Sequence, residues 1–276
     1  MKKLGLVQYL SLAALMFGTM ACEMDNLEAP AAAITGTLYD HNGLPLQIEQ
    51  GKGAGSIRIT ELSWLNKEEV VTSQELNVKF DGSYRNDKLF AATYLIHPYK
   101  GAFYPLDSVE MKTIVLKNGA TAQVDFNVTP YLEVEWASEP EIVTYAEGQH
   151  PDGKPAGKYF KAEATFKRVY KTVTNEAGEE VMLPHPSVKG GTLCVGNTHF
   201  VSANNRLGDY YSTDISVTNT QEGQTIRFIA KRDVEFSGQE YYLRIGFKSN
   251  DTDQKYNYTT VKHISLKTEE NVETEE

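Results

Sequence analysis

Short runs of alternating apolar and polar residues recur along most of this chain, and they constrain its fold more than any other feature. One run places Phe160, Ala162, Ala164 and Phe166 between polar neighbours. Alternation with a period of two is typical of a β-strand that has one face in a core and one face in water. Helical periodicity is weak, and we expect at most a turn or two of helix around 64–75. The sequence therefore predicts an all-β fold.

Turn dipeptides separate these runs from one another. Asn42-Gly43 and Asp81-Gly82 are two examples, and such pairs are favoured in tight turns because glycine reaches positive φ without steric cost. Many short strands joined by turns indicate β-sandwiches or small barrels. We therefore expect the mature chain to consist of packed antiparallel sheets.

Pro130 divides the chain into two parts, because proline cannot donate a hydrogen bond to a sheet ladder. A strand-like run ends just before it and a new alternating run begins at Leu132. The two parts have ordinary domain sizes. We expect two tandem β-sandwich domains, followed by a flexible tail; their bounds are 34–129, 131–267 and 268–276.

The first 22 residues have the features of an export signal. Lys2 and Lys3 precede a mostly apolar stretch, which predicts a signal peptide over residues 1–21. Thr19-Met20-Ala21-Cys22 resembles the lipobox of bacterial lipoproteins, which implies lipidation at Cys22. The alternative is a plain secreted protein cut near the same place. Residues 22–33 form an acidic tether that resembles the export tag of Bacteroidetes surface lipoproteins, so the expected location is the outer membrane, facing the cell exterior.

The first predicted domain resembles the carboxypeptidase-regulatory-like, or prealbumin-like, β-sandwich. Its opening segment carries Gly36, Asp40, Gly43 and the pair Pro45-Leu46 at the spacing of that family's first hairpin. Asp81-Gly82-Ser83-Tyr84 and Ala92-Thr93-Tyr94-Leu95-Ile96 are similar to its later strands, although Ala92 replaces the usual glycine. These motifs concern the fold alone, and no peptidase activity follows from them.

The whole chain is similar to a two-domain Bacteroidetes surface lipoprotein family of unknown function. The resemblance adds the Phe103-Tyr104-Pro105 segment and the Val128-Thr129-Pro130-Tyr131 joint to the features above. It implies a second sandwich of the immunoglobulin or fibronectin type. It also implies association with starch-utilisation-type glycan uptake systems, so that the partners would be a polysaccharide or outer-membrane uptake proteins.

Charge and motif content argue against several function classes. Lys+Arg number 27 and Asp+Glu 37, a net charge of −10, whereas nucleic-acid binding needs a basic face. The histidines lack zincin spacing, and Cys194 lies in a strand-like run where it is expected to be buried. Glu133 and Glu135 share one strand face, which is more typical of a solvated face than of a glycosidase pair. We expect no catalytic residue, no metal and no cofactor.

Aromatic side chains outside the core are the remaining candidates for ligand binding. A flat ring can pack on the apolar face of a sugar while polar neighbours bond its hydroxyl groups. The candidates are Tyr99, Phe103, Tyr104, Trp64 and Tyr210. The alternative for the 99–105 loop is that it packs on the other domain or on a partner protein. Trp136 alternates with Leu132 and Val134 and is expected in the core.

These observations predict a non-catalytic surface lipoprotein that binds glycans or supports a polysaccharide uptake system. The first alternative is a protein-binding scaffold or adhesin-like subunit, which a large exposed apolar patch would favour. The second alternative, a glycan-active enzyme, would need a cleft with two carboxyl groups or a His–acid pair.

Overall fold

The computed structural model describes residues 29–51, 53–63, 71–235 and 238–266. Within these ranges the regular elements are strands, apart from two short 3-10 turns, η1 (Ser108–Glu110) and η2 (Asn219–Gln221), so the predicted all-β fold is confirmed. The predicted signal peptide, Cys22 and the tail from 268 to 276 lie outside the described residues. No helix in the described part is long and apolar enough to cross a membrane.

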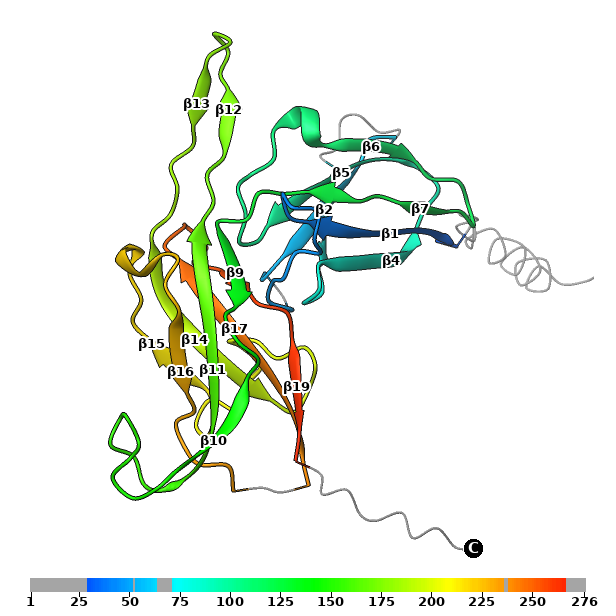
Figure 1. The fold of residues 1–276 in the computed structure, drawn as a ribbon. Helices are drawn as coiled ribbons and strands as arrows, with labels where there is room; N and C mark the ends of the chain where they lie inside the picture. The colour runs from blue at the N-terminus through cyan, green and yellow to red at the C-terminus, as the bar shows by residue number, and fades with distance from the viewer. Residues whose placement is uncertain (1–28, 52, 64–70, 236–237, 267–276) are drawn as a thin grey trace, which may run out of the picture.

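Strands β1 to β8 form the first sandwich, which has two four-stranded sheets (Figure 1). One sheet has the order β4–β1–β7, with β8 also paired to β1, and the other has the order β3–β2–β5–β6. β1 runs antiparallel to β4 and parallel to β7 and β8. The strand bounds are β1 (Ala32–Tyr39), β2 (Ser56–Glu61), β3 (Gln74–Asn77), β4 (Ser83–Leu89), β5 (Thr93–Lys100), β6 (Lys112–Val115), β7 (Thr121–Gln123) and β8 (Phe126–Asn127).

Alternate residues of these strands form the first core. On β1, Ile34 and Leu38 are fully buried, and on β5 the buried positions include Ile96. Gly36 lies on the same face of β1 as Ile34 and Leu38, directly against the ring of Tyr84. A Cβ atom at Gly36 would lie 2.7 Å from the Tyr84 hydroxyl oxygen, so this position has no room for a side chain.

Strands β9 to β19 form the second sandwich and an attached hairpin. One sheet has the order β10–β11–β16, with β9 also paired to β11. The other has the order β15–β14–β17–β18, with β19 also paired to β17. The strand bounds are β9 (Leu132–Trp136), β10 (Glu141–Tyr145), β11 (Gly157–Arg168), β12 (Thr172–Thr174), β13 (Glu180–Met182), β14 (Val188–Gly196), β15 (Thr213–Ile215), β16 (Ile226–Ile229), β17 (Glu240–Ser249), β18 (Tyr256–Tyr258) and β19 (Lys262–Ser265).

The alternation on β11 fills the second core as predicted. The apolar positions from Phe160 to Phe166 are all buried, and the rings of Phe166 and Phe247 on the facing sheet lie 5.0 Å apart. Cys194 is also completely buried, as expected from its strand-like run. Burial raises the pKa of its thiol to about 12, so the sulfur stays protonated and is a poor nucleophile.

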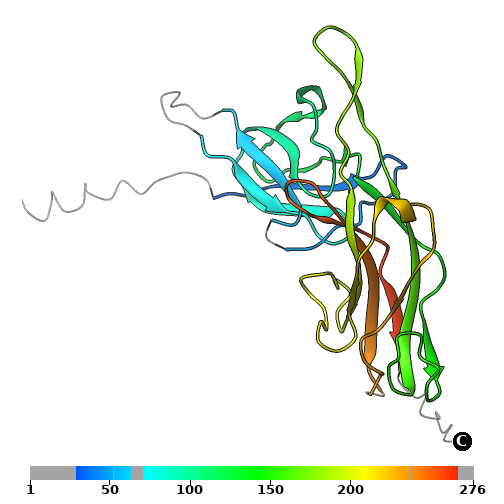
Figure 2. The same cartoon turned by 90° about the vertical axis from the view of Figure 1, so that its left-hand side faces the viewer.

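The hairpin of β12 and β13 extends away from both sandwiches (Figures 1 and 2). Its two strands pair only with each other among the described strands. Val181 and Met182 are 42% and 56% exposed. The base of the hairpin contacts the first sandwich, because the Lys171 ammonium donates to the Pro105 carbonyl and lies 3.0 Å from a Glu110 carboxylate oxygen.

The turn or two of helix expected around 64–75 is not found at Gln74 and Glu75, the end of that range. Residues 64–70 lie outside the described residues. Gln74 and Glu75 belong to β3, which pairs antiparallel with β2. The Arg58 guanidinium and a Glu75 carboxylate oxygen lie 3.3 Å apart across these two strands. Sheet pairing therefore overrides a local pattern that was too short to specify a helix.

The two sandwiches are joined by backbone pairing between residues 102–104 and residues 129–131. The Tyr104 amide donates to the Thr129 carbonyl at 2.9 Å, and the Tyr131 amide donates to the Ala102 carbonyl at 3.1 Å. The Tyr104 hydroxyl reaches the Val169 carbonyl of the second sandwich at 2.9 Å. The 102–104 segment is therefore a structural part of the joint.

Candidate functional site

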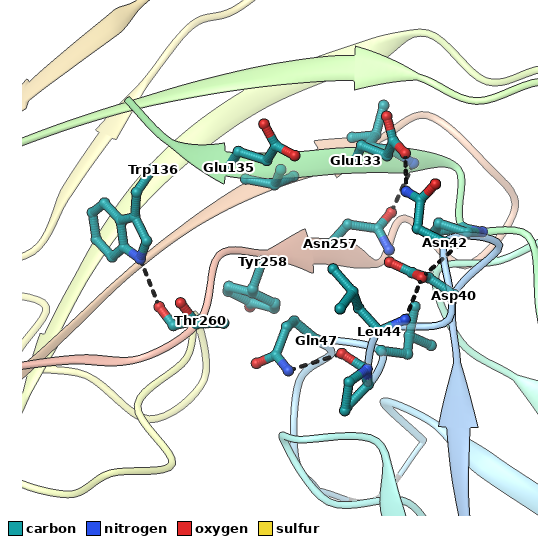
Figure 3. A pocket seen from close by; sticks show the side chains of 15 residues that line it. Asp40, Asn42, Leu44, Gln47, Glu133, Glu135, Trp136, Asn257, Tyr258 and Thr260 are labelled. Atoms are coloured by element: carbon teal, nitrogen blue, oxygen red, sulfur yellow. Dashed lines mark hydrogen bonds between the residues drawn. The ribbon is translucent and has the colours of Figure 1, made fainter. Parts of the chain in front are cut away.

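A groove of about 400 Å³ lies at the joint between the two sandwiches (Figure 3). Three segments that are far apart in the sequence form it: the loop after β1, strand β9, and the end of β18. We call it the joint groove. Its lining residues are Asp40, Asn42, Leu44, Pro45, Leu46, Gln47, Pro130, Leu132, Glu133, Val134, Glu135, Trp136, Asn257, Tyr258 and Thr260.

The loop after β1 is held in shape by its own hydrogen bonds. One carboxylate oxygen of Asp40 accepts from the amides of Asn42 and Leu44, at 2.8 and 2.9 Å. Gly43 has a φ of 78°, which glycine adopts without the steric cost that a Cβ imposes. The Asp-x-Asn-Gly sequence thus builds a rigid turn that presents Asn42 to the second sandwich.

Asn257 ties the bottom of the groove to both sandwiches. Its side-chain amide donates to the Ala102 carbonyl at 2.9 Å, and its side-chain oxygen accepts from the Leu132 amide at 3.1 Å. The residue is buried, so losing either partner would leave a desolvated polar group. This side chain therefore holds β9 and β18 in register with the first sandwich.

Arg244 of β17 anchors the end of the loop after β1, at Gln47 and Ile48. Its guanidinium is completely buried and donates to the carbonyls of Ile48 and Phe80, at 2.9 and 3.0 Å. It also donates to the Gln47 side-chain oxygen at 3.1 Å and to the Thr259 carbonyl at 2.8 Å. Burial lowers the pKa of Arg244 to about 10, which still leaves it charged at neutral pH. A cation from the second sandwich thus positions a groove residue of the first.

Glu133 closes one end of the groove. Its carboxylate accepts from the Asn42 side-chain amide at 2.6 Å and lies 2.9 Å from the His41 ring nitrogen. Figure 3 shows this group at one end and Trp136 at the other. Both ends are therefore defined by contacts between separate elements.

Trp136 forms the aromatic end of the groove. Its indole nitrogen donates to the Thr260 carbonyl at 2.9 Å, which fixes the orientation of the ring (Figure 3). The side chain is half-buried and packs against the second core. β9 pairs with β11 on one side, and its last residue lies where the groove opens. The sequence-based expectation that Trp136 is a core residue is thus only partly right.

The chemistry of the groove suits a neutral polar molecule with an apolar face. An indole ring, three side-chain amides, hydroxyl groups and carboxylates surround a preformed space, which is the usual make-up of small-molecule sites. Two carboxylates are already engaged, Asp40 in its turn and Glu133 with Asn42 and His41. Among the described residues, no group of three or more His, Cys, Asp or Glu is arranged to hold a metal ion.

Phe103 and Tyr104 are not available to a ligand, which corrects the expectation for these two residues. They are only 4% and 2% exposed because they pair with the linker at the joint. The Tyr104 and Tyr131 rings pack edge to face, with 4.8 Å between their centroids. The alternative interpretation, that this loop packs on the other domain, describes their environment.

The other candidate rings are not brought together. Tyr99 is 39% exposed, but the Arg58 guanidinium covers its face at 3.1 Å from the ring centroid. Tyr210 is 47% exposed in the second sandwich, with Arg232 5.2 Å from its ring centroid. Neither lines the joint groove. Trp64 and the predicted lipidation site Cys22 lie outside the described residues.

Sequence reasoning missed the residues that line the groove, above all Asn42, Gln47 and Trp136. The Asp40-to-Gly43 turn was visible as a turn, but nothing local indicates that it faces β9. A tryptophan on the last position of a strand next to the domain joint is the one signal that could have pointed to this site.

Residues 32–129 match the family described as "Protein of unknown function (DUF3823) N-terminal domain". No curated protein matches the sequence. A DUF3823 family protein from Bacteroides uniformis ATCC 8492 is similar in structure, with 21% identity and a TM-score of 0.66 over 86% of this chain and 100% of that chain.

Two further solved structures share the fold. A "putative carbohydrate binding protein" from Bacteroides uniformis ATCC 8492 has 22% identity and a TM-score of 0.60, over 86% of this chain and 100% of that chain. A DUF3823 family protein from Parabacteroides merdae ATCC 43184 has 18% identity and a TM-score of 0.58, with the same coverage of both chains. The matched part, 86% of this chain, is longer than either sandwich alone, so the similarity in fold extends over both sandwiches. The predicted resemblance to a β-sandwich family of unknown function is confirmed.

Proposed function

We propose that this chain, whose residues 32–129 match the DUF3823 N-terminal domain, is a non-catalytic carbohydrate-binding protein and that the joint groove is its glycan site. The observation that carries the proposal is the fixed indole of Trp136 at one end of a preformed, polar groove. The likeness in fold to a structure named for carbohydrate binding supports it.

The physical argument rests on the two faces of a sugar ring. Its axial C–H groups form an apolar surface that packs on a flat aromatic ring, and its hydroxyl groups need hydrogen-bond partners. Trp136 supplies the first, while Asn42, Gln47 and Thr260 supply polar groups along the groove. Gln47 and Asn42 are already oriented by Arg244 and Glu133, and such preorganisation reduces the entropic cost of binding.

The state of the acidic groups supports binding without catalysis. A glycosidase needs one carboxyl group to donate a proton and a second to act as nucleophile or base. Asp40 and Glu133 instead accept hydrogen bonds that hold the loop and β9 together. Cys194 is buried and protonated, while His199 is exposed, so these two do not form a nucleophilic pair.

The test is affinity gel electrophoresis of the soluble chain against a broad panel of polysaccharides. We expect at least one to retard the protein, and Trp136→Ala to weaken that interaction about tenfold or more, as is common for a buried aromatic anchor. Trp136→Phe, which keeps a ring, should lose less, and Tyr210→Ala is the matched control outside the groove. Retention unchanged in Trp136→Ala, or no retention by any polysaccharide, would refute the proposal.

We further propose that Cys22 carries a lipid anchor that holds the sandwiches at the outer membrane, facing the cell exterior, as a component of a polysaccharide uptake system. The signal-like residues 1–21 and the acidic segment after Cys22 support this location. Metabolic labelling with a palmitate analogue should mark the mature protein but not Cys22→Ser. An unlabelled wild-type protein would exclude the anchor.

A second candidate function, binding to a protein partner, is favoured by the projecting hairpin. Exposed apolar side chains on a hairpin that leaves the body of the molecule are typical of a contact surface, and Val181 and Met182 are of this kind. A photo-crosslinking residue in place of Met182 should yield a protein adduct on intact cells. If no adduct forms in the presence of the uptake proteins, this candidate is excluded.

A further inference from the structure

We infer that the joint groove selects neutral glycan chains and rejects polyanionic ones, an inference that rests on the glycan-binding proposal for the same site. The lining residues include three carboxylates, Asp40, Glu133 and Glu135, and none of the described lining residues is Lys or Arg. Recognition of uronate or sulfate groups normally uses Arg or Lys donors. The groove presents the opposite charge.

Glu135 is the carboxylate best placed to meet a bound chain. Glu135 is exposed and lines the groove, and its side-chain carboxylate makes no hydrogen bond or ion pair with the described residues. Figure 3 shows that Glu133 and Glu135 extend from the same side of β9. The Glu133 carboxylate lies at the far end, where it accepts from the Asn42 side-chain amide. A chain that lies along the groove would therefore pass two acidic positions.

The cations near the groove do not cancel this charge for a ligand. Arg244 is completely buried, and four oxygen atoms accept its donors. Lys167 is the cross-strand neighbour of Glu133 on β11 and does not line the groove. The His41 ring nitrogen lies 2.9 Å from the Glu133 carboxylate, so this ring is already engaged with that group.

The expected discrimination follows from Coulomb's law. Two like charges at contact distance in water change affinity about fivefold, and more where solvent is partly excluded. The net charge of −10 adds a repulsion that weakens with salt. A chain with an acid group on each sugar would meet such a contact at both Glu133 and Glu135, whereas a neutral chain would meet none.

The test compares derivatives of one backbone. The neutral polysaccharide that retards the protein in the panel is carboxymethylated in one sample and hydroxyethylated in another, so that size is matched and charge differs. We expect calorimetric titration at low salt to show the carboxymethyl form binding at least about tenfold more weakly than the hydroxyethyl form. The difference should narrow at physiological salt.

A charge reversal at the rim provides the matched pair of variants. Glu135→Lys should strengthen binding of the carboxymethyl form about two- to tenfold relative to the hydroxyethyl form, the range expected for exposed charge pairs. Glu147→Lys makes the same charge change on an exposed loop at the opposite end of β11 from β9. It should change neither affinity by more than about twofold.

The outcomes separate this inference from the proposal beneath it. Equal or tighter binding of the carboxymethyl form, still abolished by Trp136→Ala, would overturn charge selection and leave the glycan site in place. Equal gains in Glu135→Lys and Glu147→Lys would also overturn it, because net charge alone would then explain the effect. If only acidic polysaccharides bind, charge selection is overturned and the glycan site stays in place. If no polysaccharide of either kind binds, the glycan site itself is refuted and the inference falls with it.

Discussion

Neighbouring aromatic residues on either side of the joint have opposite roles in this molecule. Phe103 and Tyr104 sit in a short segment with turn character, yet backbone pairing with the linker buries them. Trp136 sits in a regular strand, yet it lies at the mouth of a groove. Local sequence therefore misleads about exposure wherever a segment packs against a distant part of the chain.

Gly36 in the first core is also constrained by residues that are distant in the sequence, Tyr84 and Val124. A Cβ at this position would lie 2.0 Å from the Val124 carbonyl oxygen as well as close to Tyr84. Gly36→Ala should therefore lower the free energy of unfolding by about 1–3 kcal/mol or more, through overpacking. Urea unfolding followed by circular dichroism measures this.

The matched control for Gly36 is Gly208→Ala. The nearest atom to a Cβ at Gly208 is a side-chain nitrogen of Arg206 at 3.9 Å, so its stability should stay within about 0.5 kcal/mol of the wild type. Equal stability of the two variants would show that β1 and the Tyr84 ring can separate at little cost.

At the scale of single elements, the loop between β10 and β11 holds a buried histidine. The His150 ring packs between Tyr145 and Tyr159, with centroid distances of 4.7 and 4.5 Å. One ring nitrogen accepts from the Asp152 amide at 3.1 Å, and the other is buried without a partner among the described residues. Burial lowers the pKa of His150 below its ordinary value of 6.5.

The pH dependence of stability follows from this direction. Below about pH 6.5 the unfolded chain takes up a proton at His150 that the folded chain excludes, so stability falls as the pH drops through that window. We expect His150→Gln to remove this part of the slope in unfolding free energy between about pH 7 and 5. Hydrogen bonds from Arg206 lower the pKa of Asp214 below its ordinary value of 3.8. The stability that ionised Asp214 contributes is therefore lost only at a pH below the window of His150.

His199→Gln is the control for His150, because His199 is exposed. It should keep the slope of the wild type over the same pH range. If His150→Gln also keeps that slope, His150 is accessible to protons in the folded protein and the predicted coupling is absent.

At the scale of the whole molecule, the joint makes the two sandwiches one unit. Domains that share a small polar interface usually move and unfold separately. Here a buried guanidinium and a buried amide cross the interface and satisfy backbone groups on both sides. We therefore expect one cooperative unfolding transition, with coincident curves for tryptophan fluorescence and circular dichroism.

Arg244→Met should weaken this coupling. The change leaves the Ile48 and Thr259 carbonyls without the Arg244 donor, and the Phe80 carbonyl keeps only the Ile48 amide. The cost is about 2 kcal/mol or more, and calorimetry should then resolve two transitions. Arg227→Met, at an exposed position of β16, should keep a single transition. Two separate transitions in the wild type would contradict the view of the joint as rigid.

Much of the fold was predictable because it depends on short-range patterns. Alternation on β11 and β1 specifies which face enters a core, and Asn-Gly and Asp-Gly pairs specify where strands turn. These signals need only neighbouring residues, so they can be read without knowing the partner strand. The expected helical turn near 64–75 relied on a weaker version of the same kind of signal and was wrong at Gln74 and Glu75.

The sequence alone thus specified two layered β-modules and their turns. The groove arose only on folding, because its walls come from the loop at 40–47, the strand at 132–136 and the residues near 257–260. Buried hydrogen bonds of Arg244 and Asn257 hold these walls close together. Such bonds form between atoms whose proximity depends on the complete packing of both cores, and no local pattern encodes that distance.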